Sequence, residues 1–299
     1  MVSKIKKIGQ RTGILFTLPG SLFVFSFIIY PLITNVFLSF YNYNPLNSRE
    51  MIFSGLENYK LLFTQPTFIY SLFITTSYTL LAATFQALAG LFISIFFSMF
   101  IIKNESQGVL KWLNRGVTSI LIMPWAIAGI SAAMAWRLIL HPMYSPINAI
   151  LDKQIMWLTN PLLAFFSIII ADTWKCTPYF IFFFIAGIIA IPPEQFEAAK
   201  IDGASGWGEV RHVILPNLLP ILIVAFSFRL IDGFTKIFDT VYVLTGGGPG
   251  NATKMMPILI QETGLKFFRF GLSSAMSVVA VLFSISFGVE LIRRSKDSQ

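Results

Sequence analysis

The chain has 299 residues, of which 55% are hydrophobic and only 12% are charged, and its mean hydropathy is +0.72. A soluble domain has roughly 45–50% apolar and about 25% charged residues, so this composition excludes an ordinary soluble protein and indicates an integral membrane protein. The net charge of +8 fits the enrichment of Lys and Arg in cytoplasmic loops better than nucleic-acid binding. No nucleic-acid partner is therefore expected.

Residues that could form a metal or catalytic centre are scarce. The single cysteine, Cys176, excludes an internal disulfide, and with only His141 and His212 beside it no zinc site is expected. A membrane enzyme would need His, Asp, Glu or Cys clustered at one depth, which two scattered histidines do not provide. The sequence thus predicts no catalytic residue, no cofactor and no metal in this chain.

The chain begins with a basic tail, residues 1–11, followed by a long apolar run. That run is too long for a signal-peptide core and has no small-residue cleavage site, so it is expected to be a retained first helix. The apolar segments do not alternate with polar residues as barrel strands do, which favours helices. We predict an all-α polytopic membrane protein with six transmembrane helices within residues 12–291, at residues 12–40, 67–102, 116–137, 161–191, 218–238 and 270–291.

The second apolar segment, residues 67–102, is longer than one crossing requires and could be one long tilted helix or two crossings. With one crossing, the basic residues number 12 on the side of both termini and 6 on the other. Two crossings would carry Lys103, Lys111 and Arg115 to the poorer side. The positive-inside rule therefore favours six spans, with the N-tail and the C-tail (residues 292–299) in the cytoplasm.

The loops on the opposite side are short, at roughly 20–30 residues, and too small to capture a dilute solute. One of them contains FSGLENYKLLF, residues 53–63, whose helical spacing of apolar residues predicts a helix along the outer membrane interface.

A polar stretch, residues 192–217, interrupts the apolar sequence between the fourth and fifth segments. Pro192 and Pro193 can stop one helix and start the next, and Asp202-Gly203 is expected to turn the chain. The second short helix, residues 207–214, is expected to end at Pro216. The prediction is a compact helix–turn–helix on the cytoplasmic face.

Small residues in this loop leave a thin backbone that could enter a groove on a partner, and Trp207 offers a large anchor. A turn that packs only against its own bundle explains the same composition, and the residues alone do not decide between the two.

The loop's motif decides in favour of a partner. E-A-A-x-x-D-G-A followed by I-L-P resembles the EAA loop of permeases of binding-protein-dependent ABC importers. This resemblance implies a type I importer fold (MetI-like) and a coupling helix seated on an ATPase subunit. The matching residues are Glu197, Ala198, Ala199, Asp202, Gly203, Ala204, Leu215, Pro216 and Pro220, with Trp207 as the added anchor.

Three further stretches are similar to carbohydrate-uptake permeases of the maltose type, and in particular to the larger permease of such a pair. They are FSGLENYKLLF, MPWAIAGISAAMAWR and FDTVYVLTGGGPGNAT. With 299 residues, the chain is not expected to contain the extra N-terminal helices or the large external domain of that larger permease. The resemblance implies a multi-pass protein of a prokaryotic cell membrane that works with a second homologous permease, two ATPase subunits holding ATP and Mg, an external solute-binding protein, and a carbohydrate.

TGGGPGNATK, residues 245–254, lacks the spacing of a phosphate-binding loop and falls on the outer side. It is expected to be a turn-rich loop near the translocation mouth. Without a nucleotide-binding motif the chain needs a separate ATPase.

Ionisable groups within the fourth and fifth segments are costly in a bilayer and mark a wet path or a bundle interior. Those of the fifth segment lie on one helical stripe and are expected to pair with each other, and Pro178 is expected to interrupt the fourth helix. Alternatively, these groups lock helices together. The candidate path residues are Asp172, Trp174, Lys175, Tyr179, Arg229, Asp232, Phe234 and Lys236.

The predicted function is an ATP-driven importer permease for a sugar or oligosaccharide. A secondary transporter driven by an ion gradient would also use charged spans, but it leaves the EAA loop without a role.

Overall fold

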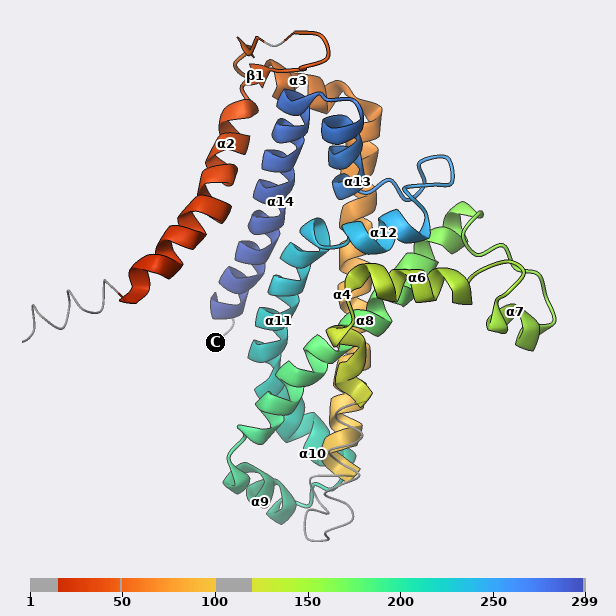
Figure 1. Cartoon of the computed structure of the whole chain (residues 1–299). Coiled ribbons are helices and arrows are strands. Elements are labelled where there is room, and N and C mark those ends of the chain that lie inside the picture. Colours follow the sequence, from red (N-terminus) through yellow and green to blue (C-terminus); the bar gives the residue numbers. More distant parts are fainter. Residues whose placement is uncertain (1–15, 49, 101–119, 298–299) are drawn as a thin grey trace, which may run out of the picture. The chain divides into compact units, whose positions relative to one another are not determined.

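The computed structural model describes residues 16–48, 50–100 and 120–297. The chain divides into two compact units (Figure 1). Unit 1 comprises Met1–Pro66 with Ile260–Val279, and unit 2 comprises Thr67–Leu259 with Ala280–Gln299. The basic tail and the loop with Lys103, Lys111 and Arg115 lie outside the described residues.

In unit 1 the first apolar segment is helical from Phe16 to Leu38, including a π-helical turn η1 (Phe25–Ile29) and α2 (Tyr30–Leu38). None of its 18-residue apolar window is buried within the chain. A helix that is apolar all round is stable in an apolar environment, such as lipid or a protein surface.

After this helix the chain forms a small antiparallel hairpin, β1 (Tyr41–Asn42) with β2 (Ile52–Phe53), and then α3 (Glu57–Thr64). The Asn58 side chain donates to the carbonyls of Ser39 and Tyr41, at 2.9 and 3.0 Å. These bonds fix α3 against the end of the first span. The helix predicted within FSGLENYKLLF is therefore confirmed.

Unit 2 contains α4 (Pro66–Phe100), a single helix of 35 residues. At 1.5 Å per residue it is about 52 Å long, which exceeds the roughly 30 Å of a bilayer core. The structure thus shows one long helix, the alternative that the distribution of basic residues favoured.

The third apolar segment is not one straight helix. It consists of Ile120–Ala126 and α6 (Gly129–Ile139), bent by 108°. The prediction of a continuous helix to residue 137 was wrong, because Ala128 takes an extended backbone, with ψ of 138°. Within the described residues, five helices are long and apolar enough to span a membrane, or six if this bent pair counts as one.

α8 (Pro161–Ile189) begins where the Asn160 side chain accepts hydrogen bonds from the amides of Leu162 and Leu163. The helix continues through Pro178, so the predicted interruption was wrong. A proline in a membrane helix is tolerated where neighbouring protein surrounds it, and Pro178 is buried within the chain.

The polar loop contains α9 (Pro193–Ile201), a turn at Gly203, and α10 (Trp207–Glu209). From Trp207 the chain is helical without a break to Thr235, through a π-helical turn η3 (Val210–Ile214) and α11 (Leu215–Thr235). The predicted end at Pro216 was wrong. Pro216 lies just after the π-helical turn η3, and the helix continues through it.

The remaining elements follow α6 and α11. They are α7 (Pro146–Leu151), α12 (Phe238–Leu244), α13 (Met256–Gln261), the π-helical turn η4 (Glu262–Lys266) and α14 (Phe270–Asp297).

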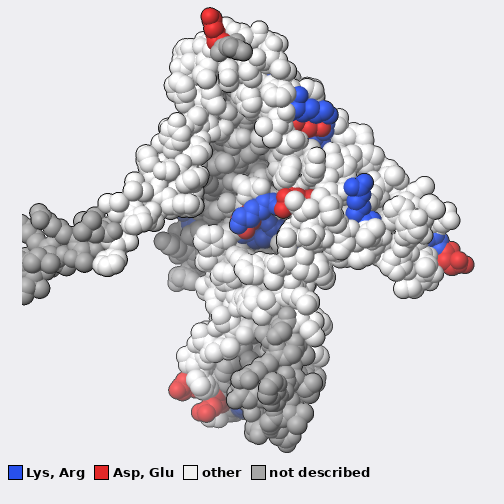
Figure 2. Space-filling model, in the orientation of Figure 1, with Lys and Arg blue, Asp and Glu red and all other residues white. Residues whose placement is uncertain are grey.

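Unit 2 has two apolar clusters. The first joins α4, α8, α12 and α13 around Tyr78, Ile168 and Val241. The second joins α8 to the loop and α11 around Phe180, Phe184 and Val213. Elsewhere the described surface is largely uncharged, and Figure 2 shows its Lys, Arg, Asp and Glu side chains gathered in a few small clusters.

Candidate functional sites in the polar loop and between the helices

The polar loop folds as a helix, a glycine turn and a second helix. Asp202 ends α9, and Gly203 follows with φ of +81°, its amide bonded to the Lys200 carbonyl. A positive φ favours glycine, so this turn follows from the sequence, as predicted. A Cβ added at Gly203 would meet no atom within 4 Å, so the turn faces open space within this chain.

The loop exposes large apolar side chains on its outer face. Ile201 is 87% exposed and Trp207 is 68% exposed. On the inner face, Phe196 and Ala199 pack against the second apolar cluster. The loop therefore has one side packed against its own bundle and another side exposed within this chain.

The predicted loop residues divide between these faces. Ala199, Ala204 and Leu215 are half-buried, and Glu197 lines a hollow of about 410 Å³ with Lys200 and Glu209. The exposed members of the motif are Glu197, Ala198, Asp202, Gly203, Trp207 and Pro216.

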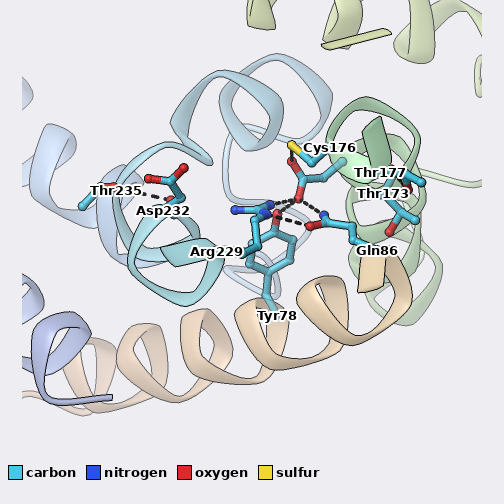
Figure 3. A network of polar contacts seen from close by, with 9 residues as sticks. Tyr78, Gln86, Thr173, Cys176, Thr177, Arg229, Asp232 and Thr235 are labelled. Atoms are coloured by element: carbon cyan, nitrogen blue, oxygen red, sulfur yellow. Dashed lines mark hydrogen bonds and ion pairs between the residues drawn. The ribbon is translucent and has the colours of Figure 1, made fainter. Parts of the chain in front are cut away.

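A buried polar network joins three helices of unit 2 (Figure 3). Asp172 on α8 is 5% exposed and Arg229 on α11 is 7% exposed, and the two side chains form an ion pair. The same Asp172 oxygen accepts from the Tyr78 hydroxyl at 2.5 Å and from the Gln86 amide at 2.8 Å. Both of these partners come from α4. A buried ion pair is tolerated when its polar atoms are satisfied in this way.

Gln86 contacts both charges. Its Nε2 donates to Asp172, and its Oε1 accepts from Arg229 Nε at 2.6 Å. Its side chain is fully buried. Cys176, one turn after Asp172, donates to the other carboxylate oxygen at 3.5 Å. The network thus ties α4, α8 and α11 together at one level.

The expectation that the ionisable residues of α11 pair with one another was wrong for Arg229. Only Asp232 and Lys236 form an ion pair along α11, at 2.8 Å, and Arg229 pairs with α8 instead. Arg229 is drawn away because Asp172 and Gln86 together satisfy its buried guanidinium, which Asp232 alone would not.

The other candidate path residues lie in different settings. Phe234 is buried and packs edge-on against Phe283, whereas Trp174 is 41% exposed and contacts Trp136. Tyr179 is half-buried and donates to the Ala225 carbonyl. Lys175 is half-buried. Its Nζ lies beside Gly129 at the bend of the third segment, only 3.0 Å from the position that a Cβ on this glycine would take.

Tyr78 and Gln86 were not predicted. Each is a polar residue within the 35-residue apolar α4, and their spacing of eight places them near one face of the helix. A buried charged pair needs further hydrogen-bond partners, so the charges in the fourth and fifth segments could have directed attention to polar residues in the other helices.

The loop at residues 245–254 is built of turns, as predicted. Gly246, Gly247, Gly250 and Asn251 have positive φ. Thr253 is buried and bonds the Thr245 hydroxyl at 2.7 Å and the Gly248 carbonyl at 2.6 Å. Among the described residues, no group of three or more His, Cys, Asp or Glu side chains could hold a metal ion.

Comparison with known proteins gives one consistent picture. Residues 107–292 match the family described as "Binding-protein-dependent transport system inner membrane component". The trehalose/maltose transport system permease protein MalF of Thermococcus litoralis is 35% identical over 301 residues, covering 98% of this chain and 96% of that protein. The sulfoquinovosyl glycerol transport system permease protein SmoG of Agrobacterium fabrum is 28% identical, covering 97% and 93%.

A solved structure has the same fold. A chain in the crystal structure of a bacterial alginate ABC transporter, in complex with an alginate pentasaccharide-bound periplasmic protein, matches with a TM-score of 0.80 and 19% identity. The match covers 99% of this chain and 97% of that chain.

Proposed function

Because this chain belongs to the family of binding-protein-dependent transport system inner membrane components, we propose that it is a permease subunit of an ATP-driven importer for a sugar or oligosaccharide. Permease subunits are not catalytic, so the chain is not an enzyme. The names of its relatives point to sugars and a sugar–glycerol conjugate, which supports the proposed cargo class.

The polar loop is the observation that carries the proposal. A polar segment with Ile201 and Trp207 exposed at its surface fits a docking site for a separate ATPase subunit. Gly203 leaves the turn thin enough to enter a groove. Movement of the ATPase would then be transmitted to the helices that flank the loop.

Two ATPase subunits, a second homologous permease and an external solute-binding protein complete the proposed complex. One coupling loop provides one docking site for one ATPase subunit. A single chain with six spans also leaves polar helix faces exposed, which a second permease could cover. The exposed Asp232–Lys236 pair supports this arrangement, since an ion pair on a membrane helix faces protein or water.

In the proposed orientation both termini and the polar loop lie in the cytoplasm of a prokaryotic cell. The loops that carry residues 53–63 and 245–254 then lie outside, where the binding protein delivers its solute. The excess of basic residues on the side of the termini supports this orientation.

Among the candidate path residues, the accessible ones are the better solute contacts. Trp174 offers an aromatic face for a sugar ring, and Lys175, Tyr179, Asp232 and Lys236 offer hydrogen-bonding groups. Asp172, Arg229 and Phe234 are buried, which favours a structural role for them.

The test is reconstitution of the complete complex in proteoliposomes with its cognate binding protein. One sugar of a panel should stimulate ATP hydrolysis and accumulate inside, and neither effect should occur without the binding protein. Accumulation without any ATPase subunit, driven by an ion gradient, would instead establish a secondary transporter.

A further inference from the structure

The two helices that carry the buried charges are also the two helices that flank the polar loop. α8 ends at Ile189, directly before the loop, and bears Asp172. α11 begins at Leu215, directly after it, and bears Arg229. At 1.5 Å per residue, the charges lie about 20–25 Å along each helix from the loop.

Between the loop and the charges the two helices share one apolar cluster. The second apolar cluster joins Phe184 and Ile188 of α8 to Val213 and Leu218. Gly187 permits close approach, because a Cβ there would lie only 2.6 Å from Leu218 Cδ2 and 2.5 Å from Ile221 Cδ1. The loop and its two flanking helices are therefore joined at the base by apolar packing and at the far end by an ion pair.

The far end is also fixed to a third helix. Tyr78 and Gln86 reach from α4 to the Asp172 carboxylate, and Gln86 holds Arg229 at the same time (Figure 3). The fully buried Gln86 side chain is thus hydrogen-bonded to both charges.

We propose that Gln86 and Tyr78 are positioning residues that, with the Asp172–Arg229 pair, clamp α8, α11 and α4 into one lever. This inference rests on the proposed function. When the polar loop is displaced, the clamp makes α4, α8 and α11 move together. Without the clamp, α8 would slide past α11 and the displacement would not reach the far ends of the helices. Packed, hydrogen-bonded elements transmit such displacements, whereas an interface without directional contacts slips.

The clamp predicts a specific kind of defect. Gln86→Leu keeps the size of the side chain and removes both of its hydrogen bonds. The complex should assemble and hydrolyse ATP, but the solute transported per ATP should fall by about tenfold or more, since the loss of even one hydrogen bond to a charged group corresponds to about that factor. The apparent KM for the solute should be unchanged, since Gln86 does not touch it.

The matched control is Thr84→Val. Thr84 lies two residues earlier on α4 and is exposed, and its hydroxyl bonds only the Leu80 carbonyl of its own helix. This variant should keep the wild-type ratio of transport to hydrolysis. Tyr78→Phe removes one hydroxyl and should lower the ratio less than Gln86→Leu, which keeps the proposal testable if Gln86→Leu fails to assemble.

A charge exchange provides the second readout. Asp172→Arg and Arg229→Asp should each lower the ratio, and the double variant should recover part of it. An unchanged ratio in Gln86→Leu and Tyr78→Phe would overturn the clamp, as would a changed KM at an unchanged ratio, which would make these residues solute contacts. If the wild-type complex itself neither transports nor responds to the binding protein, the proposed function fails first, and the two failures are distinguishable.

Discussion

Arg229 pairs with Asp172, 57 positions earlier in the chain, and not with Asp232, three residues further along its own helix. This choice defines how unit 2 is held together, since it links two long helices through charge as well as through apolar packing. The Asp172–Arg229 pair is buried, whereas the Lys236 side chain of the Asp232–Lys236 pair is 73% exposed.

Removing one member of the buried pair should destabilise the protein strongly. Arg229→Leu leaves the Asp172 carboxylate buried with its charge unbalanced, which costs about 3–5 kcal/mol in comparable cases. The Tm of the purified complex in detergent should fall, and the double variant Asp172→Leu/Arg229→Leu should regain a large part of that loss. A double variant no more stable than Arg229→Leu would contradict this account.

The exposed pair should behave differently. Lys236→Leu removes an ion pair whose lysine side chain is 73% exposed, and such pairs contribute about 0–1 kcal/mol. The same melting experiment should show little change for this variant. A fall in Tm as large as that of Arg229→Leu would contradict this expectation and would show that the Asp232–Lys236 pair contributes strongly to stability.

Gly203 tests the docking role of the polar loop. Both Gly203→Ala and Gly203→Trp impose the same backbone strain at a φ of +81°, but only the Trp side chain is bulky, and it meets nothing within this chain. Gly203→Trp should insert into the membrane normally and uncouple ATP hydrolysis from transport, while Gly203→Ala retains most of the coupling. Full transport by Gly203→Trp would refute the assigned role.

The proposed orientation can be measured with single cysteines. In a Cys176→Ser background, Asp202→Cys in the polar loop should react with an impermeant maleimide only from the cytoplasmic side. Met143→Cys, which is 78% exposed between the third and fourth segments, should react only from outside. The reverse pattern would place the loop away from any intracellular ATPase.

The sequence predicted those features that depend on local chemistry. Long apolar runs identified the membrane helices, the pair Asp202-Gly203 identified the turn, and the EAA motif identified the family. Each of these features depends on residues that are close together in the sequence, so it can be identified before the fold is known.

What failed depends on contacts between distant segments. The bend before Gly129 brings α6 beside α12 and Lys175, and the partners of Asp172 come from helices far away in the chain. Both prolines expected to break helices, Pro178 and Pro216, lie within helices that continue through them. Helix patterns alone do not contain this information.

If the outer face of the polar loop binds an ATPase subunit, Trp207 should lie at the contact. A photo-crosslinking amino acid in place of Trp207 should capture the ATPase subunit in intact cells. The same group in place of Leu162 should not capture it. Leu162 is 65% exposed and lies at the end of α8 that is farther from the polar loop. Capture of no ATPase from Trp207, or equal capture from Leu162, would contradict the claim.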